Sequence, residues 1–306
     1  MLQPLIQDAI RAADQFLRQV QAEFNPSRGQ VPGRDGGFDQ SVSGAEPKWG
    51  FDGAMADVAG AVYSRSDAPG WTRMGDGELQ AAGIDAGLLY ADGMEAGIYT
   101  DGDGRYVVAY AGNDTGGVQD VGTVIAQSAG FQTRQYDNAV TLAHQVEHAF
   151  GGDNVVYTGH SLGGGLASIA AAATGSTAVT FSAQGVHDNV LRQHGLDPVV
   201  VRHRADQGQM RHYSIDGDFA TFAQRQMPII DMLPDTLGTH IQFNNPAGLS
   251  DIGDAHNIGP LKAQIDARAD YRHEFVDPVE RVLQEVYSAV TSVIANAWRA
   301  VAPPIV

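Results

Sequence analysis

The chain has 306 residues, of which 43% are hydrophobic and 18% charged, so it can fill a sizeable core and is not a disordered chain. It contains no cysteine, which excludes disulfides, thiolate metal sites and a cysteine nucleophile. The formal net charge is −17, and no run of Lys or Arg supplies the basic face that a nucleic-acid-binding protein needs. We therefore expect no nucleic-acid partner.

The N-terminal region carries a helical pattern of apolar residues. Over residues 1–24 these residues recur at spacings of three and four, which predicts an amphipathic helix. The same region lacks a basic start, and polar residues interrupt it, so it does not read as a Sec signal peptide. No apolar stretch in the chain approaches ~18 residues, so we expect no transmembrane segment. We expect a cytoplasmic protein, or one exported without such a leader.

The remaining chain divides into three predicted parts. Residues 25–50 are rich in Gly, Pro, Ser and Asp, which indicates a linker or a long surface loop. Residues 51–274 should form the main domain. Residues 275–306 carry a long apolar stripe and predict a C-terminal helix, which either packs on the domain or covers its cleft as a lid.

Helices and strands alternate along the main domain. The predicted order is a helix at 54–63, strands at 95–100 and 105–110 joined by an Asp-Gly-Asp-Gly turn, a helix at 133–150, a strand at 154–158, a helix at 162–174, strands at 178–182, 211–215 and 241–243, and a helix at 257–268. Alternation of this kind is typical of α/β folds. We expect a mostly parallel central sheet flanked by helices, with extra helices at both ends of the chain.

One motif dominates the sequence. Gly159-His160-Ser161-Leu162-Gly163 lies between a predicted strand and a predicted helix, which is the setting of a nucleophile elbow. The tight turn should strain the backbone of Ser161 and leave its hydroxyl exposed at the end of the strand. Side chains at Gly159 and Gly163 would collide with their neighbours, and the N-terminus of the helix would direct N–H groups toward a developing oxyanion. The side chain of His160 should point away from this site.

A serine nucleophile needs a base and a carboxylate, which follow the serine in the order Asp or Glu, then His, in α/β-hydrolases. The predicted strand at 211–215 ends in Asp216 and Asp218, and Asp218 lies further into the loop. His256 follows on a later loop, just before a predicted helix. His240 is the rival base, but it enters a predicted strand, where a packed histidine is the commoner role.

Several segments together resemble the class 3 lipases and their bacterial phospholipase-like relatives over roughly residues 51–268. They are YVVAYAGND, VVYTGHSLGGGLASIAA, AVTFSAQG, YSIDGDFAT and DAHNIG. The resemblance implies an α/β-hydrolase fold, with Asp218 and His256 as the partners of the serine. It aligns Tyr110-Ala111-Gly112-Asn113 with a Phe-Arg-Gly-Thr-like strand end. The backbone N–H groups of Asn113 and Leu162 would then form the oxyanion hole.

These features predict a serine hydrolase that cleaves carboxylic esters of lipids through Ser161, Asp218 and His256 and an acyl-enzyme. No metal or organic cofactor is required. A smaller-substrate esterase, an acyltransferase and a non-catalytic binding scaffold are the alternatives. The partner would be a lipid or another ester, met at a membrane surface. A bacterial lipase effector with an immunity protein is a further hypothesis, motivated by the lipase-like core, the lack of a Sec leader and the terminal helices.

Overall fold

The structure is a computed structural model, and it describes residues 37–112, 133–217, 234–245 and 255–271. Of these, all residues up to Asp266 belong to one compact unit, Gly29–Asp266. The predicted terminal helices in 1–24 and 275–306 lie outside the described residues. So do Asn113 and Asp218.

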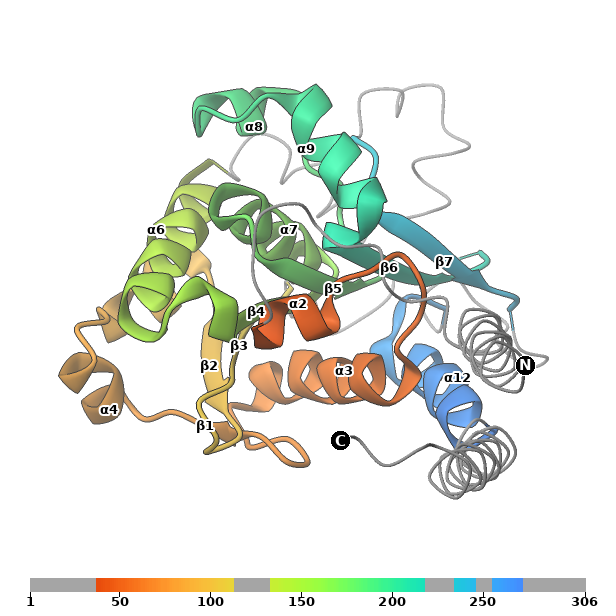
Figure 1. Ribbon diagram of the computed structural model, residues 1–306, viewed down its shortest axis with the longest axis horizontal. Helices are drawn as coiled ribbons and strands as arrows, with labels where there is room; N and C mark the ends of the chain where they lie inside the picture. Colours follow the sequence, from red (N-terminus) through yellow and green to blue (C-terminus); the bar gives the residue numbers. More distant parts are fainter. Residues whose placement is uncertain (1–36, 113–132, 218–233, 246–254, 272–306) are drawn as a thin grey trace, which may run out of the picture. The chain divides into compact units, whose positions relative to one another are not determined.

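A seven-stranded sheet forms the centre of this unit (Figure 1). Its strands are β1 (Thr72–Arg73), β2 (Ala96–Thr100), β3 (Tyr106–Tyr110), β4 (Val155–His160), β5 (Thr177–Phe181), β6 (Met210–Ile215) and β7 (Thr239–Phe243), and they are adjacent in chain order. Strands β1 to β3 pair antiparallel, whereas β3 to β7 are all parallel. Every residue of β4, β5 and β6 is buried, as expected of parallel strands covered on both faces. The sheet confirms the predicted α/β class.

Helices cover both faces of the sheet (Figure 1). They are α2 (Phe38–Val42), α3 (Trp49–Ser64), α4 (Asp76–Ala81), η1 (Ala86–Gly93), α6 (Thr133–Phe150), η2 (Gly152–Asn154), α7 (Leu162–Thr174), α8 (Asp188–Gln193), α9 (Pro198–Arg204), η3 (Ala205–Gln209) and α12 (Ile258–Tyr271). Helices α6, α7, α8 and α9, which lie between successive parallel strands in the chain, share a hydrophobic core on one face, as expected when such crossovers have the same hand. Helices α2, α3 and α12 share the core of the other face. Within the described segments, no helix combines the length and apolarity needed to cross a membrane.

The long elements agree with the sequence prediction, and the main difference lies before residue 51. Of the predicted linker or surface loop at 25–50, the structure describes residues 37–50. These contain α2 and the start of α3, and Val42 is 1% exposed. The abundant Gly, Ser and Asp suggested a loop, but here they shape short turns that lie against the sheet.

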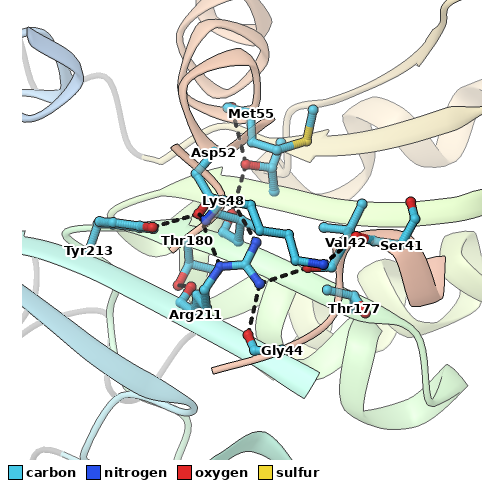
Figure 2. Close-up of polar contacts among 12 residues, drawn as sticks. Ser41, Val42, Gly44, Lys48, Asp52, Met55, Thr177, Thr180, Arg211 and Tyr213 are labelled. Carbon is cyan, nitrogen blue, oxygen red and sulfur yellow. Dashed lines mark hydrogen bonds and ion pairs between the residues drawn. The ribbon is translucent and has the colours of Figure 1, made fainter. Parts of the chain in front are cut away.

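A buried ion pair joins α3 to the sheet (Figure 2). The side chains of Arg211 on β6 and Asp52 on α3 are both 0% exposed, and two bonds of 3.0 and 2.5 Å connect them. Tyr213 donates a third bond of 2.5 Å to the same carboxylate. Two buried charges are tolerated only when they are paired and fully hydrogen-bonded, and this arrangement meets that condition.

The same guanidinium also holds the segment before α3. Its Nη1 atom donates to the carbonyl oxygens of Val42, at 2.7 Å, and Gly44, at 2.8 Å. The backbone N–H of Lys48 donates to Asp52 at 2.8 Å. Burial, together with the nearby positive charge of Arg211, lowers the pKa of the Lys48 ammonium to about 8. Residues 42–52 are thus fixed to the sheet by one charged group.

We expect Arg211→Met to lower the free energy of unfolding by about 3–5 kcal/mol, because it leaves the Asp52 carboxylate buried without its counterion. The matched control is Arg134→Met. Arg134 pairs with Asp92 at the surface, its side chain is 78% exposed, and its loss should cost less than about 1 kcal/mol. Urea unfolding of both variants measures the difference, and equal losses would contradict the structural role of Arg211.

Candidate active site

Ser161 occupies a tight turn between β4 and α7. Its φ of +58° is rare for a residue with a side chain and places the backbone under strain. Four backbone hydrogen bonds hold the turn: its N–H donates to Phe181 at 3.1 Å, and its carbonyl accepts from Gly164 at 3.0 Å, Gln184 at 2.9 Å and Gly165 at 3.4 Å. The backbone at Ser161 therefore has the strained strand–turn–helix conformation that was predicted for a nucleophile elbow.

The glycines around Ser161 allow α7 to approach the sheet closely. A Cβ atom on Gly159 would lie 2.3 Å from the carbonyl oxygen of Gly163, and one on Gly163 would lie 2.0 Å from that of Tyr110. A Cβ atom on Gly164 would meet the side chain of Ala183 at 2.4 Å. These distances confirm the predicted collisions at Gly159 and Gly163, because the backbone leaves no space for a methyl group.

His256 lies beside the serine. Its Nε2 atom is 3.0 Å from the Oγ atom of Ser161, and the residue is only 7% exposed. The structure therefore brings together two predicted site residues that are 95 positions apart. The rival His240 lies on β7, as predicted, where its Nε2 pairs with the hydroxyl of Ser214 at 2.7 Å.

The carboxylate of the predicted triad is only partly described. Asp216 is exposed at the end of β6, where its N–H donates to Phe243 at 2.7 Å and its carboxylate accepts from Gln242 at 3.4 Å. The backbone of Asp216 therefore continues the parallel pairing of β6 with β7, and its carboxylate is bonded to Gln242 and not to His256. Asp218 follows two residues later, outside the described residues, and its role stays a prediction.

Two backbone elements approach Ser161 where an oxyanion would form. Leu162 is the first residue of α7, and N–H groups in the first turn of a helix have no partner within that helix. Gly112 lies on the other side, since a Cβ atom there would be only 3.0 Å from the Cβ of Ser161. Asn113, the other predicted member of the oxyanion hole, directly follows Gly112 and is outside the described residues.

The prediction for His160 was wrong. Its Nε2 is 2.7 Å from the carbonyl oxygen of His256, and the two imidazole rings lie 4.9 Å apart. Alternation along β4 directs His160 to the same face of the sheet as Val156, which is the face covered by α3 and α12. His256, which precedes α12, reaches the end of β4 from that face, so the two histidines meet there.

Tyr63 is a residue of the site that the sequence reasoning missed. It lies in the last turn of α3, and its hydroxyl is 3.1 Å from Nδ1 of His160 and 2.8 Å from the backbone nitrogen of Gly112. In the sequence it is one apolar-face residue of a predicted helix, 97 positions before His160. A contact over such a separation leaves no local signal.

No group of three or more His, Asp or Glu side chains within the described ranges is arranged to hold a metal ion. The described residues instead place a hydroxyl group, that of Ser161, beside an imidazole, that of His256. A neutral imidazole can remove the proton of a hydroxyl at hydrogen-bond distance, which turns the oxygen into a nucleophile.

Comparison with known proteins identifies the family. Residues 54–268 match the model of a phospholipase-like family, described as the Tle-like phospholipase domain, and the chain belongs to this family. It is 41% identical over 207 residues to an extracellular phospholipase A1 of Serratia liquefaciens. That similarity covers 66% of this chain and 63% of the Serratia protein, so the chain spans less than two thirds of its relative's length.

One solved structure is also similar in part. It is a crystal structure of a mutant form of MDLA from Penicillium cyclopium, with a TM-score of 0.39 and 15% sequence identity. The similarity covers 68% of this chain and 83% of the other.

We expect Gly163→Ala to lower the free energy of unfolding by about 3 kcal/mol, because its Cβ would collide with a backbone oxygen that cannot move aside. Gly77→Ala is the control. Gly77 is an exposed glycine of α4 with open space around its Cβ position, so alanine should raise stability by about 0.5–1 kcal/mol. Urea unfolding checks both changes, and a Gly163→Ala variant as stable as Gly77→Ala would refute the close approach of α7.

Proposed function

We propose that the protein is a phospholipase that hydrolyses a carboxylic ester of a glycerophospholipid, with Ser161 as nucleophile and His256 as general base. The observation that carries this proposal is the 3.0 Å contact between Ser161 Oγ and His256 Nε2 at a strained strand–helix turn. Membership of a phospholipase-like family and the similarity to a phospholipase A1 support a lipid ester as substrate.

In the proposed mechanism, His256 takes the hydroxyl proton as the Ser161 oxygen attacks the ester carbonyl. The tetrahedral oxyanion accepts hydrogen bonds from the backbone N–H groups of Leu162 and Asn113. Collapse of this intermediate expels the lysophospholipid alkoxide, which receives the proton from His256. The acyl group then remains on Ser161. Water, activated by His256, attacks the acyl-enzyme and releases a fatty acid.

A carboxylate orients the imidazole in this scheme, and we assign that role to Asp218. It follows β6 closely in the sequence, and β6 ends at the carboxyl edge of the parallel strands, where the ends of β3 and β4 and residue Ser161 also lie. Asp218 also occupies the aspartate position implied by the resemblance to class 3 lipases. Asp216 is already engaged by Gln242.

The substrate class is tested with three substrates. These are phosphatidylcholine vesicles with different acyl chains at the two glycerol positions, a triacylglycerol emulsion, and a soluble short-chain ester. We expect fatty acid release from the vesicles, and the identity of the released chain reports the position that is cleaved. Hydrolysis of the soluble ester alone would indicate a smaller-substrate esterase, and no hydrolysis of any substrate would indicate a binding scaffold.

We expect Ser161→Ala to abolish ester hydrolysis, with a loss in kcat of about 10⁶-fold, because no other group can form the acyl-enzyme. The control is Ser168→Ala, which removes another hydroxyl from α7. Ser168 is 2% exposed and donates to Gly164 at 2.8 Å, so its loss should reduce stability slightly and leave kcat unchanged. Initial rates on vesicles give the comparison, and retained hydrolysis by Ser161→Ala would reject the nucleophile.

We expect Asp218→Asn to lower kcat by about 10⁴-fold, since a neutral amide neither holds the imidazole of His256 in the correct tautomer nor stabilises its imidazolium form. Asp216→Asn should keep nearly full activity, because Asp216 is exposed and bonded to Gln242. Steady-state kinetics on one ester distinguish the two positions. The reverse order of losses would transfer the orienting role to Asp216.

A further inference from the structure

Three hydrogen bonds form a continuous chain beside the proposed nucleophile and base. The backbone nitrogen of Gly112 is 2.8 Å from the hydroxyl oxygen of Tyr63. That oxygen is 3.1 Å from Nδ1 of His160, and Nε2 of His160 is 2.7 Å from the carbonyl oxygen of His256. The chain starts at the loop after β3, passes through α3 and β4, and ends on the residue that carries the proposed base.

The donors and acceptors fix the direction of this chain. A carbonyl oxygen can only accept, so Nε2 of His160 must carry a proton and donate it to His256. In a neutral imidazole the other nitrogen is then an acceptor, and the hydroxyl of Tyr63 donates to it. The oxygen of Tyr63 in turn accepts the N–H of Gly112. For a neutral imidazole, this is the one arrangement of protons that satisfies all three bonds.

The surroundings strengthen these bonds. His160 is 8% exposed and His256 is 7% exposed, so water has little access to the bond between them. The ring of Tyr63 meets that of His160 edge-on at 6.2 Å, and the two imidazole rings are 4.9 Å apart. Hydrogen bonds in such a low-dielectric setting hold their geometry better than exposed ones.

We propose that Tyr63 and His160 are positioning residues for the hydrolysis, an inference that rests on the proposed function. His160 fixes the backbone of His256, and with it the distance from its Nε2 to Ser161. Tyr63 fixes both His160 and Gly112, the residue before the proposed oxyanion-hole residue Asn113. One hydroxyl group therefore links the residue that holds the base to the backbone of Gly112, and it acts through these two residues rather than on the reacting atoms.

The expected effect is on the chemical step rather than on substrate binding. A shift of about 1 Å in a reacting group can cost on the order of a hundredfold in rate. A loosened His256 would still allow the ester to bind. Substitutions that break one of these hydrogen bonds should therefore lower kcat and leave KM nearly unchanged. A general loss of folded protein would instead lower the apparent kcat in proportion to the fraction of folded molecules.

The first experiment compares Tyr63→Phe with Tyr157→Phe on a soluble ester. Tyr63→Phe keeps the ring and removes the hydroxyl, and we expect kcat to fall on the order of ten- to a hundredfold with KM constant. Tyr157 is a buried tyrosine of β4 whose hydroxyl contacts Ala143 and Glu147 on α6. Its replacement should leave kcat unchanged. Equal kcat values for both variants, at equal folded fractions, would overturn the positioning role.

The second experiment uses two replacements of His160. In His160→Gln the amide nitrogen can reach the position of Nε2 and still donate to His256, whereas His160→Asn retains a polar group only near the position of Nδ1. We expect the glutamine variant to keep kcat within about threefold of the wild type and the asparagine variant to lose on the order of a hundredfold. Both variants lose the ring, so packing losses affect them alike. Equal losses in kcat would overturn the role of this bond.

Imidazole ¹⁵N NMR of the wild-type protein tests the proposed proton arrangement in these three hydrogen bonds without any substrate. His160 should be neutral with its proton on Nε2, and a proton on Nδ1 would overturn the proposed arrangement. Together, the activity measurements distinguish a failure of the proposed function from a failure of the positioning role. A wild-type protein that hydrolyses no ester would overturn the proposed function and the positioning role together. An active wild-type protein with an unaffected Tyr63→Phe variant would overturn the positioning role alone.

Discussion

The turn at Ser161 is the constraint on which the rest of the site depends. A residue with a side chain is held at a φ of +58° by backbone hydrogen bonds to the end of β5, to the first turn of α7 and to the loop after β5. Three glycines let α7 approach the sheet within distances that no side chain would allow. The strain at one residue is therefore offset by the packing of a whole helix. As a result, the hydroxyl of Ser161 lies at the carboxyl edge of the parallel strands, where loops from several strands can reach it.

Helix α3 links that edge to the opposite end of the sheet. Near its start, Asp52 pairs with Arg211 on β6, and in its last turn Tyr63 contacts His160 and Gly112. A rigid helix of 16 residues held at both ends places the tyrosine hydroxyl with little freedom. The buried ion pair therefore helps to hold the helix that positions Tyr63 at the active site, although the ion pair itself takes no part in the proposed chemistry.

Local patterns in the sequence were enough for the long elements and for the nucleophile, and long-range contacts account for what they missed. The helix at 133–150 has clear periodicity, the helix at 162–174 is an unbroken run of small and apolar residues, and both end at glycine, so their bounds were predicted correctly. Ser161 could be identified because the residues that shape its turn lie next to it in the sequence. Short elements such as α2 and α9 have too few residues for periodicity. The side chain of His160 was misjudged because alternation tells which face it takes, but not that His256 arrives on that face.

The bonds made by Arg211 also bear on where an independently folding fragment of this chain begins. The match to the family covers residues 54–268, which excludes Asp52 and the carbonyl groups of Val42 and Gly44. A fragment cut at that boundary would lose the counterion and two of the acceptors of this guanidinium group, and breaking a buried ion pair costs about 3–5 kcal/mol, much of the stability of an ordinary domain. We therefore expect an independently folding fragment to include α2, and so to begin before the boundary of sequence similarity.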